Sequence, residues 1–134
     1  MTNSVFADTF FFLALLNEKD DQRPRAVSLA NSLRGRMVTT TWVLSELADG
    51  LADTPGRSLF KPFVARFQSD PRGVVVPATQ PLFERAVDLY HDRPDKEWSL
   101  TDCVSFVMMN ELNIRDALTA DHQFEQAGFV ALLK

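Results

Sequence analysis

The chain has 134 residues, of which 46% are hydrophobic and 24% charged, and its formal net charge is −4. This length and composition predict a single folded domain over residues 1–134 and exclude a disordered chain. The negative charge excludes a generic basic surface for nucleic acid, but it does not exclude an enzyme that acts on nucleic acid.

Strand and helix signals alternate along the first third of the chain. The apolar run Val5–Ala7 predicts a strand, and the longer run Thr9–Leu16 that follows it predicts a helix. Apolar residues at helical spacing predict a second helix over Asp20–Leu33, which Gly35 stops before a β-prone run. That run, Met37–Thr40, is the second predicted strand.

The middle of the chain predicts a helical hairpin followed by another strand. One helix is expected over Trp42–Ala52, ended by a Pro55-Gly56 turn, and a second helix carries the one-sided stripe Phe60, Phe63, Val64 and Phe67. After these come a short buried strand at Val74–Val76, a helix over Leu82–Tyr90 and a charged loop at His91–Glu97.

The last third completes the alternation. Asp102 heads an apolar helix, and a strand at Ala117–Ala120, a turn at Asp121–Gln123 and an apolar run at Phe129–Leu133 follow. Strands separated by helices pair in parallel through right-handed crossovers. The predicted fold class is therefore α/β, a three-layer α/β/α sandwich with a mainly parallel sheet.

Cellular context is indicated by two features. The run from Val5 to Leu16 contains Asp8, is too short to span a bilayer and lacks the features of a signal peptide, so no membrane association is expected. The single cysteine, Cys103, lies in an apolar helix and is interpreted as a core thiol in a reducing compartment. Both features favour the cytoplasm.

Three aspartates are expected at one edge of the sheet. Asp8 and Asp121 follow strands, and Asp102 begins a helix that leads back to the strand before Asp121. In open α/β sheets the functional crevice lies outside the carboxyl ends of the strands, so these acids are grouped as a candidate site.

Each of these acids also has a purely structural interpretation. Asp8 and Asp121 can be simple helix N-caps, and Ser99-Leu100-Thr101-Asp102 fits a capping box. Glu46 has no such capping signature, but it lies at the border of its helix's polar face, and helical periodicity does not distinguish it from an ordinary surface glutamate.

Four converging carboxylates suit a hard divalent cation. Mg²⁺ and Mn²⁺ prefer oxygen ligands, and such a site activates water and neutralises charge on a phosphodiester. Without a cation, the carboxylates would repel one another and raise one another's pKa.

Three segments resemble the PIN-domain family, in particular the toxins of VapBC toxin–antitoxin systems. They are VFADTFFFLALLN near the start, TTTWVLSELADGL in the first half and DKEWSLTDCVSFVMMNELNIRDALTADHQFEQAGF near the end. The resemblance covers essentially the whole chain, and the last segment is its most specific part.

The resemblance implies a Mg²⁺- or Mn²⁺-dependent endoribonuclease, a hydrolase that cuts RNA phosphodiester bonds. The family's acidic quartet corresponds to Asp8, Glu46, Asp102 and Asp121. Because a cation and the N-terminus of its helix can share the charge of Asp102, we predict that Asp102 and Asp8 are the principal metal ligands. Thr9 matches the hydroxyl residue often found beside the first acid and is expected to hydrogen-bond that acid from the second coordination shell.

Other residues near the candidate site are not expected to take part in its chemistry. Asp95 lies in the charged loop and is mainly expected to be solvated, and His122 is interpreted as a polar residue at a helix start rather than a base. The run Phe10-Phe11-Phe12 is interpreted as core rather than as a platform for stacking bases. Trp98 is expected to pack beneath the loop before Ser99.

Partners follow from the resemblance and from one surface. The resemblance implies an RNA substrate, a cognate antitoxin and a homodimer, and the stripe on the Phe60–Phe67 helix suggests a groove for an antitoxin helix. Packing of that stripe into the core is the open alternative.

Other classes of function compete with the toxin interpretation. A haloacid-dehalogenase-type phosphatase needs a second aspartate two residues after Asp8, where this chain has Phe10, so this class is discounted. A solitary PIN nuclease in RNA processing and a non-catalytic interaction domain, whose acids only cap helices, remain as alternatives.

Overall fold

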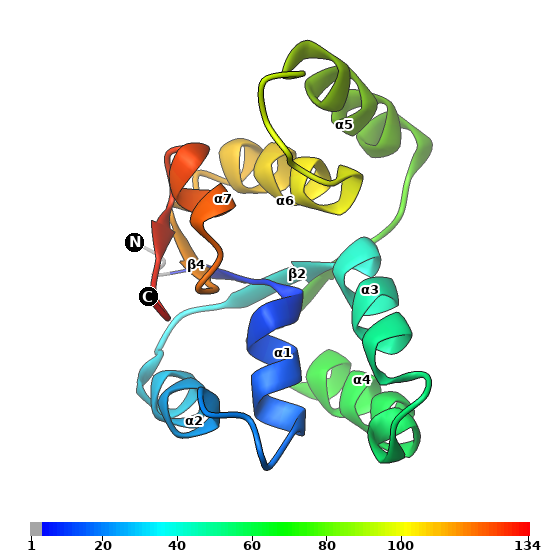
Figure 1. Cartoon of the computed structure of the whole chain (residues 1–134). Coiled ribbons are helices and arrows are strands. Elements are labelled where there is room, and N and C mark those ends of the chain that lie inside the picture. The colour runs from blue at the N-terminus through cyan, green and yellow to red at the C-terminus, as the bar shows by residue number, and fades with distance from the viewer. Residues whose placement is uncertain (1–3) are drawn as a thin grey trace.

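The computed structural model describes residues 4–134 and contains one five-stranded sheet between two layers of helices (Figure 1). The strands are β1 (Val5–Ala7), β2 (Met37–Thr40), β3 (Gly73–Val76), β4 (Asp116–Leu118) and β5 (Val130–Ala131). The helices are α1 (Thr9–Leu16), α2 (Arg23–Ser32), α3 (Thr41–Leu51), α4 (Phe60–Ser69), α5 (Gln80–Asp92), α6 (Leu100–Glu111) and α7 (His122–Gln126), with a 3₁₀ turn η1 (Pro55–Leu59) before α4.

The sheet is parallel throughout, in the order β3-β2-β1-β4-β5. Figure 1 shows α1, α2 and α4 on one side of it and α6 and α7 on the other, with α5 outside α6. The predicted α/β/α sandwich is confirmed. The chain first moves outward from β1 through β2 to β3 and then returns to the other side of β1, so the strand order reverses between β1 and β4.

Aromatic side chains fill both sides of the sheet. On the α1 side, Phe12 meets Phe63 and Phe67 edge-on, with ring centroids 5.2 and 5.7 Å away. On the other side, Phe106 meets Trp98 and Phe124, each at 5.0 Å. Burial of this apolar surface is the main force that holds the helical layers on the sheet.

The predicted core is largely confirmed. Phe11, Phe12 and Cys103 are fully buried, whereas Phe10 stays 36% exposed. The predicted stripe on α4 packs onto the core, with Phe67 buried and its other members partly buried.

Several predicted boundaries were wrong by a few residues. The second helix begins at Arg23 rather than Asp20, because Pro24 suits a first turn and residues 17–22 form turns. The strand β4 ends at Leu118 rather than Ala120, which frees Thr119 and Ala120 to lead into the site. The strand β3 was predicted to be buried, but it is an edge strand and only half-buried.

No helix within residues 4–134 is both long enough and apolar enough to span a bilayer.

Candidate active site

The point where the strand order reverses, between β1 and β4, lies beside two of the predicted acids. Asp8 directly follows β1, and its backbone N–H donates to the carbonyl of Leu118 at the end of β4. Asp121 lies three residues after Leu118. In open parallel sheets this reversal opens a crevice at the carboxyl ends of the strands, which is where such folds place ligands.

Asp8 is a buried carboxylate that has no cationic partner among residues 4–134. Its side chain belongs to a residue only 6% exposed, and it accepts a hydrogen bond from the Thr119 hydroxyl at 3.1 Å. Burial raises the pKa of the Asp8 carboxyl from 3.8 to about 7, and the hydrogen bonds from Thr9 N–H and Thr119 oppose that rise. Asp8 occupies the N-cap position of α1, yet its side chain makes no capping bond. The capping interpretation therefore does not account for this residue.

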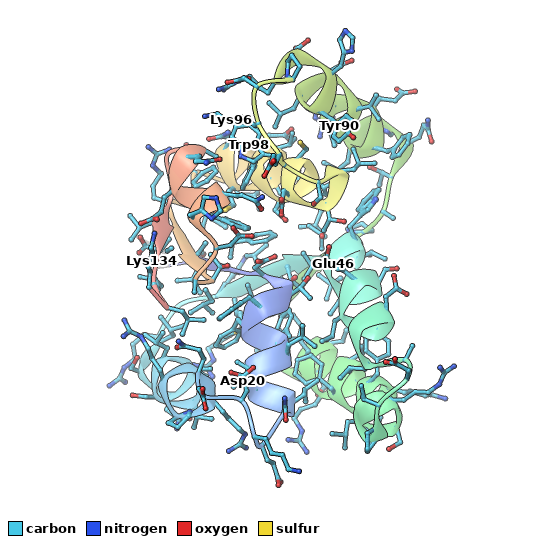
Figure 2. The ribbon with its side chains drawn as sticks, viewed as in Figure 1. Asp20, Glu46, Tyr90, Lys96, Trp98 and Lys134 are labelled. Carbon is cyan, nitrogen blue, oxygen red and sulfur yellow. The ribbon has the colours of Figure 1, made fainter. Side chains whose placement is uncertain are left out.

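Glu46 reaches the same end of the sheet from α3. Figure 2 shows it beside the N-terminal end of α1, and its Oε1 accepts a short hydrogen bond from the Thr9 hydroxyl. The expectation that Thr9 bonds Asp8 through its side chain was wrong, because that hydroxyl points across to Glu46. Thr9 thus supports Asp8 through its backbone N–H and Glu46 through its hydroxyl, and it joins α1 to α3.

Asp102 heads α6 in a complete capping box. Its N–H donates to Ser99 Oγ at 3.0 Å, and its Oδ2 accepts from the Ser99 N–H at 3.0 Å. Burial raises the pKa of Asp102, and the carboxylates of Asp121 and Glu46 raise it further, against the lowering effect of the Ser99 bonds. The capping role is therefore real, but the neighbouring negative charges are not explained by it.

Asp121 and Gln123 complete this side of the crevice. Asp121 caps α7, since its Oδ1 accepts from the backbone N–H of Gln123 at 3.0 Å, and its own N–H donates to Thr119 Oγ1 at 3.1 Å. The side-chain amide nitrogen of Gln123, in the orientation that satisfies its hydrogen bonds, is 2.9 Å from Oδ2 of both Asp102 and Asp121. A continuous series of hydrogen bonds thus runs from Asp8 to Asp102.

Within the described part of the chain, three of the acids have no basic side chain beside them. Among residues 4–134, no Lys or Arg forms an ion pair with Asp8, Glu46 or Asp102. The neighbouring carboxylates Asp102 and Glu46 raise the pKa of Asp8, and Asp121 and Glu46 raise the pKa of Asp102. In the same described part of the chain, however, no three Asp, Glu, His or Cys side chains are close enough together to hold a metal ion as they stand.

The donor set nevertheless fits a hard divalent cation. Asp8, Glu46 and Asp102 each have one carboxylate oxygen that receives no side-chain hydrogen bond from residues 4–134. Mg²⁺ usually takes only one or two carboxylates directly and keeps several waters, so convergence of three carboxylates is not required. Carboxylates with an unbonded oxygen are therefore suitable donors for an ion of this class.

Two neighbouring candidates lie apart from this network. Asp95 forms a two-bond ion pair with Arg93 at 3.0 Å, which lowers the pKa of Asp95, and the pair is solvent-exposed. The His122 side chain is 67% exposed, and its Nδ1 lies 3.6 Å from Asp121 Oδ1. Neither residue bonds Asp8, Glu46 or Asp102.

Sequence reasoning missed Thr119 and Gln123. Thr119 stands two residues before Asp121, a spacing at which a hydroxyl often accepts a local backbone N–H, so the pattern T-x-D contained a weak signal. Nothing in the order of residues showed that Thr119 also donates to Asp8 or that Gln123 reaches Asp102.

Comparisons with known proteins agree with this architecture. The model of the PIN domain matches residues 5–130. The 23S rRNA-specific endonuclease VapC20 of Mycobacterium tuberculosis is 31% identical over 127 residues, covering 94% of this chain and 95% of VapC20.

Solved structures show the same similarity. The crystal structure of Mycobacterium tuberculosis VapC20, a sarcin–ricin loop cleaving toxin, superposes with a TM-score of 0.85 at 28% identity, covering 94% of this chain and 96% of that one. VapBC2 from Rickettsia felis, bound to a promoter DNA fragment, gives 0.65 at 14% identity and 96% coverage of both chains, a likeness of fold alone.

Proposed function

Because the chain belongs to the PIN-domain family, we propose that it is an endoribonuclease and the toxin of a type II toxin–antitoxin pair. The observation that carries this proposal is Asp8, a buried carboxylate with no capping bond that faces further acids at the reversal point of the sheet. Keeping such a group without a cationic partner costs stability, so a role outside the fold is needed to account for it.

The proposed substrate is ribosomal RNA. The relative VapC20 is named a 23S rRNA-specific endonuclease and covers nearly the whole chain. We therefore choose 23S rRNA, and its sarcin–ricin loop first, as the RNA to test.

We propose that Asp8 and Asp102 hold a Mg²⁺ or Mn²⁺ ion, and that Glu46 and Asp121 complete the acidic pocket. Such an ion, when bound, activates a water and neutralises charge on the phosphodiester. The protein orients the carboxylates: Thr119 holds Asp8, and Thr9 holds Glu46. Hydrogen bonds of this kind commonly tune metal affinity from outside the ligand shell.

The non-catalytic alternative makes a different prediction. Asp121 caps α7 and Asp102 completes the capping box of α6, so a protein whose acids serve only these structural roles would tolerate asparagine at each site. Asp8 makes no capping bond, and this difference favours the enzyme. A solitary nuclease would share the site but lack an antitoxin.

We also propose a cognate antitoxin and a homodimer as partners. The stripe on α4 is mostly used by the core, which leaves Phe60, Phe63 and Val64 partly exposed as possible anchors. Co-expression with the product of a neighbouring small reading frame, followed by co-purification and light scattering, tests both partners. A monomer at micromolar concentration would overturn the homodimer.

The function is tested by cleavage of 23S rRNA with Mg²⁺ or Mn²⁺, with and without EDTA. We expect specific cleavage by the wild type, loss with EDTA, and loss in Asp8→Asn and Asp102→Asn. Asp88→Asn, an exposed acid on α5, is the matched control and should cleave normally. Cleavage that survives EDTA would overturn the metal role, and full activity in Asp8→Asn would overturn the site.

A further inference from the structure

Gln123 lies at the second position of α7, with its side chain between two of the acids. Its amide nitrogen is 2.9 Å from Asp102 Oδ2 and 2.9 Å from Asp121 Oδ2. We propose that Gln123 is a positioning residue that donates one N–H to each carboxylate, fixes their separation and thereby aims Asp102 at the cation. This inference rests on the proposed function.

The orientation of the amide follows from its neighbours. An amide nitrogen has two N–H donors, and both carboxylate oxygens are acceptors, so each donor has one partner. The opposite orientation would place the carbonyl oxygen of Gln123 against two carboxylate oxygens. Its nitrogen would then have a single bond of 3.4 Å, to the backbone carbonyl of Glu97.

The bonds of Gln123 separate the roles of the two acids. Asp121 is held at both oxygens, by the backbone N–H of Gln123 at Oδ1 and by its side chain at Oδ2. Asp102 receives its bonds from Ser99 and Gln123 at Oδ2 alone, and Oδ1 remains available. Asp102 is thus oriented toward a ligand, whereas Asp121 is an anchor for Gln123.

A neutral donor suits this position better than a cationic one. Two carboxylates that share one amide nitrogen repel each other, and the two hydrogen bonds offset part of that repulsion. A Lys or Arg here would neutralise the pocket and compete with a divalent ion. Gln123 holds the acids together and leaves their negative charge for the cation.

The first test is Gln123→Met, which keeps the length of the side chain and removes both donors. The backbone N–H at position 123 still donates to the capping carboxylate of Asp121, so α7 is expected to remain. Gln126→Met is the matched control, because Gln126 lies on the same helix, accepts a bond from Trp98 Nε1 and makes no side-chain hydrogen bond to Asp102 or Asp121.

The readout is the melting temperature as a function of Mn²⁺ concentration, which requires no RNA. Loss of an outer-shell partner typically weakens metal affinity about 10- to 100-fold, so Gln123→Met should need at least ~10-fold more Mn²⁺ for half of the shift. Gln126→Met should match the wild type. Equal Mn²⁺ dependence in Gln123→Met and wild type overturns the positioning role and leaves the proposed function intact.

A second measurement needs no variant. In the metal-free wild type, the side-chain amide protons of Gln123 should exchange with water measurably more slowly by NMR than those of Gln126, whose amide nitrogen donates no side-chain hydrogen bond among residues 4–134. Equally fast exchange overturns the bridge. Absence of any Mn²⁺ shift in the wild type overturns the inference together with the metal site, and RNA cleavage then decides whether nuclease function survives without it.

Discussion

Two helix starts in this molecule each place an aspartate beside the crevice, and they do so in opposite ways. At the start of α6, Asp102 and Ser99 satisfy each other in a capping box, so the acid contributes to the stability of its helix. At the junction of β1 and α1, Asp8 makes no capping bond and is almost fully buried. The same residue type therefore supports the fold in one place and costs stability in the other.

The comparison shows which acid demands a functional explanation. Asp102 is half-buried and belongs to a capping box, so its structural role alone would account for an aspartate at this position. A buried Asp8, whose pKa rises to about 7, is unfavourable when ionised unless a cation joins it. The strongest tests therefore change Asp8, and weaker ones change the groups around the capped acid.

The largest effect is expected for Asp8→Asn. Cleavage should fall by about three powers of ten or more, because a ligated cation contributes several kcal/mol to the transition state. At pH 8 and without metal, the free energy of unfolding of the variant should exceed that of the wild type by on the order of 4 kcal/mol, because the buried charge is removed. Denaturant unfolding in EDTA measures the gain, and a less stable variant would contradict it.

The same residue predicts a pH dependence. The folded-state pKa of Asp8 is raised from 3.8 to about 7, so the folded protein holds this proton more tightly than the unfolded chain. Stability from this group is fully present below pH 4 and is lost as the pH rises to 7. The difference in unfolding free energy between wild type and Asp8→Asn should follow that interval in EDTA, and a difference independent of pH would contradict the burial of Asp8.

Substitution of Asp102 should affect RNA cleavage and the free energy of unfolding differently. Asp102→Asn should lose cleavage as severely as Asp8→Asn, but its unfolding free energy should change by less than about 1 kcal/mol, because asparagine still accepts the Ser99 N–H. Asp102→Ala should lose cleavage and also about 1 kcal/mol of stability. Retained cleavage in Asp102→Asn would show that Asp102 has only a structural role, in the capping box of α6.

Thr9→Val tests the link between α1 and α3. The variant keeps the shape of the side chain and removes the hydroxyl that donates to Glu46. We expect cleavage to fall about tenfold, as is common when an outer-shell bond is lost. Ser28→Ala, on α2 and away from the crevice, is a control for loss of a hydroxyl. Unchanged RNA cleavage in Thr9→Val would show that the hydrogen bond from Thr9 to Glu46 does not contribute to activity.

The smallest effect is expected for Ser99→Ala. Loss of this N-cap should cost about 1 kcal/mol of unfolding free energy. Cleavage should fall by less than tenfold, because Gln123 still bonds Asp102. Thermal unfolding and RNA cleavage measure both effects, and a larger loss of cleavage than in Thr9→Val would reverse the proposed order.

Much of the architecture could be predicted from the order of residues. Apolar runs and helical spacing identified the alternation of strands and helices, because these patterns reflect local periodicity and burial. The positions of Asp8 after a strand and Asp102 at a helix start were likewise visible, as was the capping box. The exact start of α2 was not, because Pro24 is compatible with either side of a helix boundary and local turns decided the outcome.

The bonding of the site was decided by tertiary structure alone. Thr119 meets Asp8 across 111 residues because β4 pairs with β1, and Thr9 meets Glu46 because α3 packs beside α1. Gln123 reaches Asp102 only once α6 and α7 lie on the same face of the sheet. The sequence by itself determined which acids lie at strand ends and helix starts, since those positions depend on near neighbours. Their partners depend on strand order and helix packing, which bring together side chains that no local pattern relates.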